Sequence, residues 1–334
     1  MATAALINPE ISILPLPEAD LVALETLFDE ECAEWLDLLK WDYTGSSMLI
    51  RDVTRQRQLS GVVAMSGSAT VGFAYYVIEG SRCSIGDIYV SSPWRGIGVD
   101  REMTVAIFDR LDGLSRLRRI ESQCVGIGND GADSLFESRG FERLERHYML
   151  LELGSSVESG AAVESDAAVE KGAAVDLNDV SIRRWQQNDA RHATRVIHRS
   201  YRDTHDSRIN SQYRTLQGCG ELLAILTDHI WCGDFIPQAS SVALSPRGAM
   251  AGVLLASRVS RGVGHIGQIS IHPANQNRGI GRRMIKVALM EFRRLGFEGV
   301  TLAVTGANTN AMHLYESCGF STIHTFPVYY REKK

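Results

Sequence analysis

The stretch HIGQISIHPANQNRGIGRRM, residues 265–284, contains the strongest structural signal in the chain. Its first part alternates apolar residues in the pattern of a buried strand and ends with Ile269 and Ile271. A proline then stops the strand, and the glycines of RGIG (278–281) precede a helical pattern. The stretch therefore predicts a strand, a tight glycine loop and the start of a helix.

The loop QNRGIGR (276–282) has the features of an anion site. The first backbone N–H groups of a helix have no partner within it, and together with the positive end of the helix dipole they attract phosphate. Gly279 permits a positive φ, and Gly281 lets a ligand approach the backbone without a Cβ in the way. Arg278 and Arg282 add positive charge. We therefore expect a pyrophosphate-bearing ligand here, although a strand–helix turn that only needs glycine remains the alternative.

The chain repeats itself with an offset of about 180 residues. LFESRGF (135–141) returns as LYESCGF (314–320), and IGDIYV (85–90) returns as IGQISI (266–271). RGIGVDREM (95–103) aligns with QNRGIGRRM (276–284) when Arg95 is set against Gln276. The simplest explanation is a duplicated domain.

A compositionally biased segment separates the two copies. The hexapeptides GAAVES, DAAVEK and GAAVDL follow one another over residues 160–177, and the segment is rich in Ala, Ser and Glu and contains no aromatic residue to pack. This composition is typical of a linker. We predict a first domain at 1–153, a low-complexity linker at 154–176 and a second domain at 177–334.

Each half has the same expected order of elements. A short strand and helical stretches come first, then three strands joined by turns, at 61–66, 71–78 and 83–90 in the first half and 240–245, 250–258 and 263–272 in the second. The glycine loop, a helix, a strand, a short helix and a last strand follow. An antiparallel meander that leads into a strand–loop–helix unit indicates a mixed α+β fold, with a mostly antiparallel sheet flanked by helices in each domain.

Composition excludes several classes of function. The 334 residues have a net charge of −5 and a pI near 6.0, so nothing suggests a nucleic-acid or membrane-surface partner. The six cysteines form no C-x-x-C pair or metal-ligand cluster, so we expect reduced thiols and no bound metal. The start lacks the basic and apolar regions of a secretory signal, and we expect a cytoplasmic protein. Composition predicts no oligomeric state.

The second half resembles the GCN5-related N-acetyltransferase (GNAT) superfamily. The resemblance rests on the strand ending in Ile269 and Ile271, on Pro273, on the Q-x-x-G-x-G loop and on N-x-x-A-x-x-L-Y-E-S-x-G-F at 308–320. It extends over 177–334 in strand order and, in weaker form, over 1–153. The duplicated arrangement is similar to that of tandem GNAT proteins.

The resemblance implies acetyl-CoA as co-substrate and a role for each matching position. The backbone of Ile269 and Ile271 is expected to pair with the pantetheine arm and the acetyl carbonyl. Asn308 is expected to contact the arm, and Tyr315 to protonate the leaving thiolate. The amides that would hold the pyrophosphate belong to residues Asn277, Arg278, Gly279, Ile280, Gly281 and Arg282.

His265 is the candidate general base. It precedes Gln276 by eleven residues, the spacing at which histone-type members of the superfamily carry a catalytic glutamate. A histidine titrates near neutral pH and can remove a proton from the attacking amine. A solvent-exposed strand-end histidine is the structural alternative, and His272 or a water chain are alternative routes for the proton. For Tyr315, the alternative is a core tyrosine whose hydroxyl points to the surface.

The first half keeps the frame of the motifs but changes their chemistry. Asp100 replaces Gly281, which places a side chain and a negative charge at the expected pyrophosphate site. Phe136 replaces Tyr315 and has no proton to donate, and Ser84 stands at the position of His265. Asn129, the counterpart of Asn308, is unchanged. We therefore expect the first domain not to acetylate by the same mechanism.

The sequence thus predicts an N-acetyltransferase that transfers acetyl from acetyl-CoA to a primary amine by direct attack in a ternary complex. Two alternatives remain: a non-catalytic acyl-CoA-binding protein and an N-acyltransferase that uses a longer acyl-CoA. The amine is expected to belong to a small molecule or a peptide. His205, Asp206 and Tyr213 are candidates for its pocket, but a polar surface explains them equally.

Overall fold

The computed structural model describes residues 10–125, 132–154, 180–227 and 232–333. Apart from Gly154, the predicted linker 154–176 lies outside these residues, as does Asn129. The chain forms two compact units. Unit 1 contains 1–147, 305–307 and 324–334, and unit 2 contains 148–304 and 308–323.

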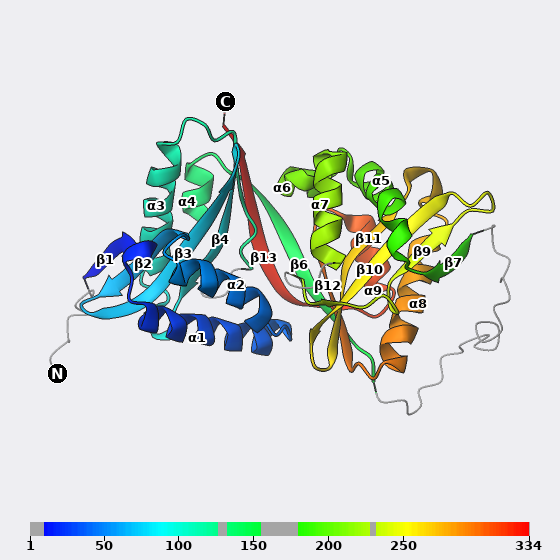
Figure 1. Ribbon diagram of the computed structural model, residues 1–334, viewed down its shortest axis with the longest axis horizontal. Coiled ribbons are helices and arrows are strands. Elements are labelled where there is room, and N and C mark those ends of the chain that lie inside the picture. Colours follow the sequence, from blue (N-terminus) through cyan, green and yellow to red (C-terminus); the bar gives the residue numbers. More distant parts are fainter. Residues whose placement is uncertain (1–9, 126–131, 155–179, 228–231, 334) are drawn as a thin grey trace, which may run out of the picture. The chain divides into compact units, whose positions relative to one another are not determined.

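Unit 1 is a mixed sheet with helices packed on it. A meander pairs β1 to β4 antiparallel, β5 lies parallel to β4, and β13 pairs antiparallel with β5. The strands are β1 (Ile11–Pro15), β2 (Ser60–Ser66), β3 (Ala69–Glu79), β4 (Arg82–Val90), β5 (Arg119–Ser122) and β13 (Ser321–Glu332). The helices are α1 (Leu21–Leu39), α2 (Thr44–Arg55), α3 (Val99–Asp112) and α4 (Asp133–Ser138). Figure 1 shows α3 close to β2 and β3.

Unit 2 repeats this plan. Strands β7, β9, β10 and β11 pair antiparallel in this order, β12 lies parallel to β11, and β6 adjoins β12. The strands are β6 (Glu142–Glu152), β7 (Ser181–Arg184), β8 (Asp234–Phe235), β9 (Ser241–Leu244), β10 (Met250–Ser260), β11 (Val263–Ile271) and β12 (Gly299–Thr305). The helices are α5 (Ala190–Tyr201), α6 (His205–Ile209), α7 (Leu216–Thr227), α8 (Ile280–Arg294) and α9 (Thr309–Glu316). The predicted mixed α+β class with two similar domains is confirmed by both units.

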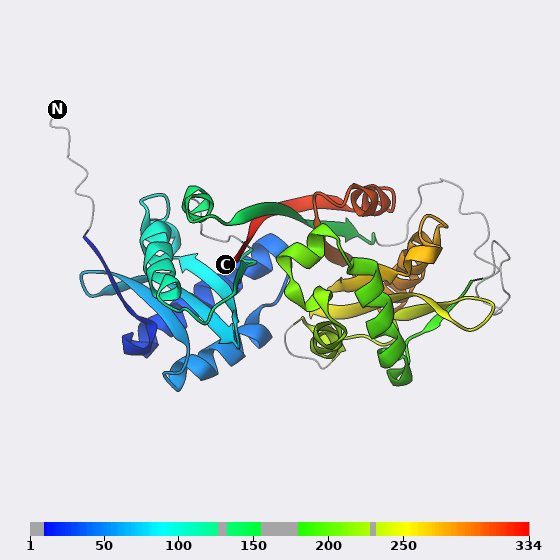
Figure 2. The same cartoon turned by 90° about the horizontal axis from the view of Figure 1, so that it is seen from above.

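Helices cover both faces of the unit 2 sheet because β10 is apolar on both sides. Val253 and Leu255 pack against α5 and α7, whereas Leu254 packs against α8. A strand buried on both faces is expected to be a continuous apolar run, as β10 is. Figure 2 shows the yellow strands between the green helices and the orange helix. Burial of each leucine side chain contributes about 2 kcal/mol to the free energy of unfolding.

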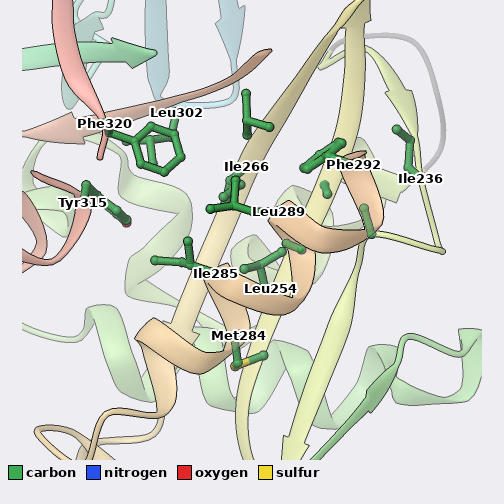
Figure 3. Packing of buried hydrophobic residues seen from close by; sticks show 14 of the residues in the cluster. Ile236, Leu254, Ile266, Met284, Ile285, Leu289, Phe292, Leu302, Tyr315 and Phe320 are labelled. Atoms are coloured by element: carbon green, nitrogen blue, oxygen red, sulfur yellow. The ribbon is translucent and has the colours of Figure 1, made fainter. Parts of the chain in front are cut away.

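The apolar stripe of α8 fixes the helix on the sheet. Met284, Ile285 and Phe292 are fully buried on one side of α8, and Figure 3 shows them with Leu254 and Ile266 of the strands in one cluster. Gly264 faces the ring of Phe292 so closely that a Cβ would lie 2.2 Å from it. This packing determines where the first turn of α8 points.

The two sequence halves contribute strands to each other's units. β13 belongs to the second half of the sequence, yet its segment 324–332 completes the sheet of unit 1, with Tyr329 opposite Ser122. β6 is the last strand of the first half, yet its segment from Tyr148 onward belongs to unit 2, where Leu153 N–H donates to the Glu298 carbonyl. Neither half of the sequence therefore contains all the strands of its own sheet. In Figure 1 the red β13 runs alongside the strands of unit 1.

No helix among the described residues is long and apolar enough to cross a membrane.

The packing of β13 in unit 1 gives a prediction about stability. The ring of Tyr329 stacks on Phe136 at 4.1 Å and is 4% exposed. Tyr329→Ala is expected to cost about 3 kcal/mol because it leaves a cavity under α4. Hydrogen exchange should show lost protection in β5 and α4 but not in β12. Tyr329→Phe keeps the ring and is the matched control, and equal loss of protection in β12 would contradict the assignment of this strand to unit 1.

Candidate active site

An extra residue in β11 controls which side chains face which layer. Leu255 pairs with Gln268, but the next residue of β10, Ala256, pairs with Ile266, so Gly267 is a β-bulge. Ile266, before the bulge, packs on the α8 side, and Ile269, after it, packs there too. Gln268 faces the opposite side, where it accepts a hydrogen bond of 2.9 Å from Tyr213 of the 3₁₀ turn Ser211–Arg214. The bulge thus separates an apolar side from a polar side within a few residues.

The sheet opens beyond the bulge. β11 and β12 pair only from Val263 with Gly299 to Ile266 with Leu302, although β11 continues to Ile271 and β12 to Thr305. A cavity of about 800 Å³ lies along the free side of β11. Both Ile269 and Ile271 line it. An unpaired strand edge offers its backbone N–H groups to an extended ligand, while the Ile269 and Ile271 carbonyls accept hydrogen bonds from the side chains of Tyr201 and Ser200.

The glycine loop forms the second wall of this cavity. After a short 3₁₀ turn, Asn277 has φ of 59° and Gly279 has φ of 73°, and α8 begins at Ile280. A Cβ at Gly281 would lie 3.3 Å from Leu314 Cδ2 and 3.8 Å from Ile271 Cγ1, so glycine keeps the space in front of the helix open. This helix start suits an anion, as the sequence predicts.

Helix α9 forms the third wall. Asn308 caps it, and its side chain accepts a hydrogen bond of 3.2 Å from the Ala311 amide. Tyr315, further along the same helix, is 7% exposed and lines the cavity. Figure 3 shows Tyr315 at the margin of the apolar cluster, on the same side as Phe320. Arg282 reaches the end of α9, where its Nη2 donates to Ser317 Oγ at 2.7 Å.

Most of the predicted site residues share this cavity. The lining includes Ile269, Ile271, Asn277, Gly279, Ile280, Gly281, Arg282, Asn308 and Tyr315. Arg278 is outside the lining, and its Nη1 lies 3.4 Å from Asn275 Oδ1. Of the candidate acceptor residues, Asp206 lines the cavity.

His265 does not line the cavity. Its side chain is buried, its Nδ1 lies 2.9 Å from Thr301 Oγ1, and its ring stacks with Tyr148 at 6.0 Å. The bulge places His265 and Gln268 on the side of β11 opposite to Ile269. A proton from the cavity would therefore reach His265 only through intervening groups. Its role as base stays a prediction. His272 is half-buried, and its Nε2 lies 3.1 Å from Arg199 Nη1.

Two stacked tyrosines, Tyr201 and Tyr213, lie on the Gln268 side of β11, and the sequence motifs do not reveal this pair. Tyr213 donates to Gln268 Oε1 at 2.9 Å, and its ring stacks on Tyr201 at 4.1 Å. Tyr201 lines the cavity, and its hydroxyl donates to the Ile269 carbonyl at 3.3 Å. Burial and the neighbouring Tyr213 raise the pKa of Tyr201 well above its ordinary value, so this hydroxyl stays protonated. An isolated glycine in the strand pattern, Gly267, is the available sequence signal.

Unit 1 keeps the same backbone frame. Gly96 has φ of 72° and Gly98 has φ of 91°, the positions that match Asn277 and Gly279, and α3 begins immediately afterwards. Asp100, which replaces Gly281, is 5% exposed in the first turn of α3. Phe136, which replaces Tyr315, is 1% exposed and packs on Phe108, Phe141 and Tyr329. The hydroxyl of the second half is therefore replaced here by a purely apolar contact.

Unit 1 also carries an acidic pair, the half-buried Asp87 and the buried Glu31. Asp87, the counterpart of Gln268, accepts hydrogen bonds from Tyr43 at 3.0 Å and Tyr75 at 2.9 Å. Glu31 is 3% exposed. Burial, with the Asp87 charge second, raises the pKa of Glu31 well above its ordinary value. A small cavity of about 210 Å³ adjoins Asp87 and Cys124, and burial raises the pKa of this thiol to about 12. A protonated thiol is a poor nucleophile.

The sequence profile of the acetyltransferase (GNAT) family matches residues 21–141 and 212–320, which is more than half of the chain. The protein belongs to this family. It is an acetyltransferase by family, and each compact unit contains most of one match.

Solved structures show the same fold over the whole chain. A GCN5-related N-acetyltransferase from Sphaerobacter thermophilus aligns over 96% of this chain and 95% of its own, with a TM-score of 0.62 and 15% identity. A tandem GNAT protein from the clavulanic acid biosynthesis pathway aligns over 97% of this chain and 98% of its own, with a TM-score of 0.54 and 14% identity.

The matches to curated relatives are shorter. The mycothiol acetyltransferase of Propionibacterium freudenreichii is 31% identical over 94 residues, which are 27% of this chain and 30% of that protein. The tRNA(Met) cytidine acetyltransferase of Salmonella typhimurium is 32% identical over 105 residues, which are 30% of this chain and 14% of that protein. Each match thus spans less than a third of the relative.

The described residues contain no group of three or more His, Cys, Asp or Glu side chains that could hold a metal ion.

The buried acid of unit 1 gives a pH-dependent prediction. Because its pKa is raised in the folded state, Glu31 binds its proton more tightly there than in the unfolded chain. The free energy of unfolding therefore falls as pH rises from the ordinary carboxyl pKa toward the raised pKa of Glu31, because ionisation is easier in the unfolded chain. Glu31→Gln removes this loss, so its stability relative to the wild type should increase with pH, by about 1.4 kcal/mol for each unit of pKa shift.

Urea unfolding at about pH 5 and about pH 8 measures this difference. Glu30→Gln, a half-buried neighbour on α1, is the matched control. An advantage of Glu31→Gln that is the same at both pH values would contradict the raised pKa.

Proposed function

We propose that this protein is an acetyl-CoA-dependent N-acetyltransferase whose catalytic centre lies in unit 2. The observation that carries the proposal is the single cavity lined by the free edge of β11, the glycine loop and Tyr315. Its volume of about 800 Å³ is in the range of cofactor sites. The family match supports the reaction class.

The residues of unit 2 fit the parts of acetyl-CoA. The pyrophosphate suits the amides in front of α8, where Gly281 leaves the approach open. The pantetheine arm suits the edge of β11 at Ile269 and Ile271, as an added strand would. Acetyl-CoA supplies an activated thioester, and the protein binds it, orients it and moves protons.

Tyr315 is the proposed acid. Attack by the amine on the thioester carbonyl breaks the C–S bond, and the departing sulfur takes a proton from the Tyr315 hydroxyl. A thiolate has a conjugate acid of pKa about 8.5, so a positioned donor lowers the barrier to its departure. Tyr315 is buried and lines the same cavity as Ile269 and Ile271 of the β11 edge, which suits this role.

The amine must lose a proton before or during attack, because a free alkyl ammonium has a pKa of about 10.4. His265 is the proposed acceptor of this proton through water or through polar groups on its side of β11. Gln268 and the Tyr213 hydroxyl lie on this side, 2.9 Å apart.

Attack is proposed to be direct, with no acyl-cysteine intermediate. Cys318 is the cysteine nearest in sequence to Tyr315, but it is partly buried against the apolar cluster. Burial raises the pKa of its thiol, against the favourable charge of Arg282. The raised pKa works against the thiolate that a nucleophile needs.

Release of free CoA with a panel of primary amines tests the proposal. Turnover of acetyl-CoA that depends on an amine is expected, and its absence with every amine would favour a non-catalytic acyl-CoA-binding protein. Replacing acetyl-CoA by longer acyl-CoAs in the same assay tests the donor.

Tyr315→Phe separates catalysis from binding. The ring that packs with Phe320 is retained, so the affinity for acetyl-CoA should change by less than about twofold, whereas kcat should fall by about 100-fold. Unchanged turnover in this variant would remove Tyr315 from the mechanism.

Gly281→Asp introduces into unit 2 the residue that unit 1 carries at Asp100. A carboxylate about 4 Å from the pyrophosphate repels it by about 1 kcal/mol in water and by about 4 kcal/mol when partly shielded, so the affinity for acetyl-CoA should fall at least about fivefold. Titration calorimetry measures this change. Gly281→Ala isolates the effect of the Cβ, and an Asp variant that binds as tightly as the Ala variant would contradict the assigned pyrophosphate position.

A further inference from the structure

The charge of unit 2 is distributed unevenly. The chain has a net charge of −5, yet residues 181–214 contain eight arginines and three aspartates and no lysine or glutamate. Asp189 is engaged by Arg183 through two hydrogen bonds of 2.7 and 2.8 Å. The positive surplus therefore lies on α5 and on the segments that follow it.

Part of this surplus lines a pocket. Its volume is about 660 Å³. The lining residues are His198, Arg202, Asp203, Thr204, Ser207, Arg208 and Arg214. Arg202 and Thr204 also line the cavity that contains Tyr315. The basic pocket and the proposed catalytic cavity therefore adjoin.

The walls of this pocket are held by hydrogen bonds. Arg214 Nε donates to the Ser207 carbonyl at 2.8 Å, and His198 Nε2 lies 3.3 Å from the Arg214 carbonyl. Thr204 caps α6 by accepting from the Ser207 amide at 3.4 Å. These contacts join α5, α6 and the 3₁₀ turn Ser211–Arg214. The backbone elements that carry the pocket's charged residues are thus tied to one another.

The one carboxylate of the lining does little to neutralise the pocket. Asp203 lies 3.6 Å from Arg202 Nε, and the two side chains are 91% and 75% exposed. An ion pair this exposed is worth at most about 1 kcal/mol because water screens it. Three arginines and one exposed aspartate line the pocket, so the net charge of its lining is positive and favours an anion.

We propose that the basic pocket binds a carboxylate or phosphate group of the acceptor while the acceptor amine reaches the cavity of Tyr315. This inference rests on the proposed function. A guanidinium group binds either anion through two parallel hydrogen bonds, and this geometry orients the bound molecule as well as attracting it. The pocket volume suits a small molecule. The acceptor class is therefore an anionic amine.

Two probes test the pocket without requiring turnover. Protein saturated with CoA, so that the glycine loop is filled, is titrated with inorganic phosphate and with succinate by calorimetry. At least one anion is expected to bind, and Arg208→Gln, which changes a residue of the basic pocket alone, should weaken its binding about tenfold. Arg195→Gln, an exposed arginine on α5 outside both linings, is the matched control and should bind as the wild type does.

Absence of binding by both anions, or equal binding by Arg208→Gln and the wild type, would overturn the proposal. A preference for CoA over dephospho-CoA that Arg208→Gln abolishes would also overturn it, because the pocket would then serve the cofactor.

A kinetic comparison addresses the acceptor itself. Glucosamine 6-phosphate and glucosamine share one amine and differ by one phosphate. The phosphorylated sugar is expected to have at least a tenfold higher kcat/KM, and Arg208→Gln should remove this advantage while leaving kcat/KM for glucosamine unchanged. Turnover of both sugars at equal kcat/KM would overturn the acceptor class while leaving the acetyltransferase activity intact. Failure of every amine in the wider panel would instead contradict the proposed function. The anion titration would then decide whether the pocket binds anions.

Discussion

The extra residue in β11 is the constraint on which the candidate site depends. Because Gly267 is an extra residue, the side chains after it alternate between the two faces of the sheet out of phase with those before it. β11 also stops pairing with β12 after Ile266. The same insertion occurs in β4, where Gly86 and Asp87 stand opposite Tyr75. A Cβ at Gly86 would lie 2.1 Å from the Tyr75 ring, so glycine is required there by close packing. The opened strand pair therefore belongs to the fold, and the chemistry depends on what lines the opening.

The two units line this opening differently. In unit 2 the helix start is left clear by Gly281, and a hydroxyl is supplied by Tyr315. In unit 1 the equivalent positions are Asp100 and Phe136, and the latter packs in a cluster of aromatic rings. A frame that stays the same while its polar groups change is the expected result when one copy is kept for packing and the other for reaction.

Much of this arrangement follows from the sequence. The order of elements, the glycine loop and the position of Tyr315 could be predicted because each depends on local pattern: alternation, glycine at positive φ and one apolar helical face. The exchange of β6 and β13 could not be predicted from the sequence. Both segments have the ordinary pattern of a last strand, and a local sequence pattern does not indicate which sheet a strand joins. The tyrosine pair Tyr201 and Tyr213 depends on tertiary contacts across the bulge. The environment of His265, buried against Thr301, likewise depends on a neighbouring strand.

The asymmetry between the units is the central claim, and the stoichiometry of acetyl-CoA binding tests it most directly. Titration calorimetry of the full chain should give one tight site per chain because, among the residues described, only unit 2 combines a glycine in the first turn of the helix after the glycine loop with a cavity of about 800 Å³ that the helix start lines. Two sites of similar affinity per chain would contradict the account, since Asp100 would then be no obstacle to the pyrophosphate.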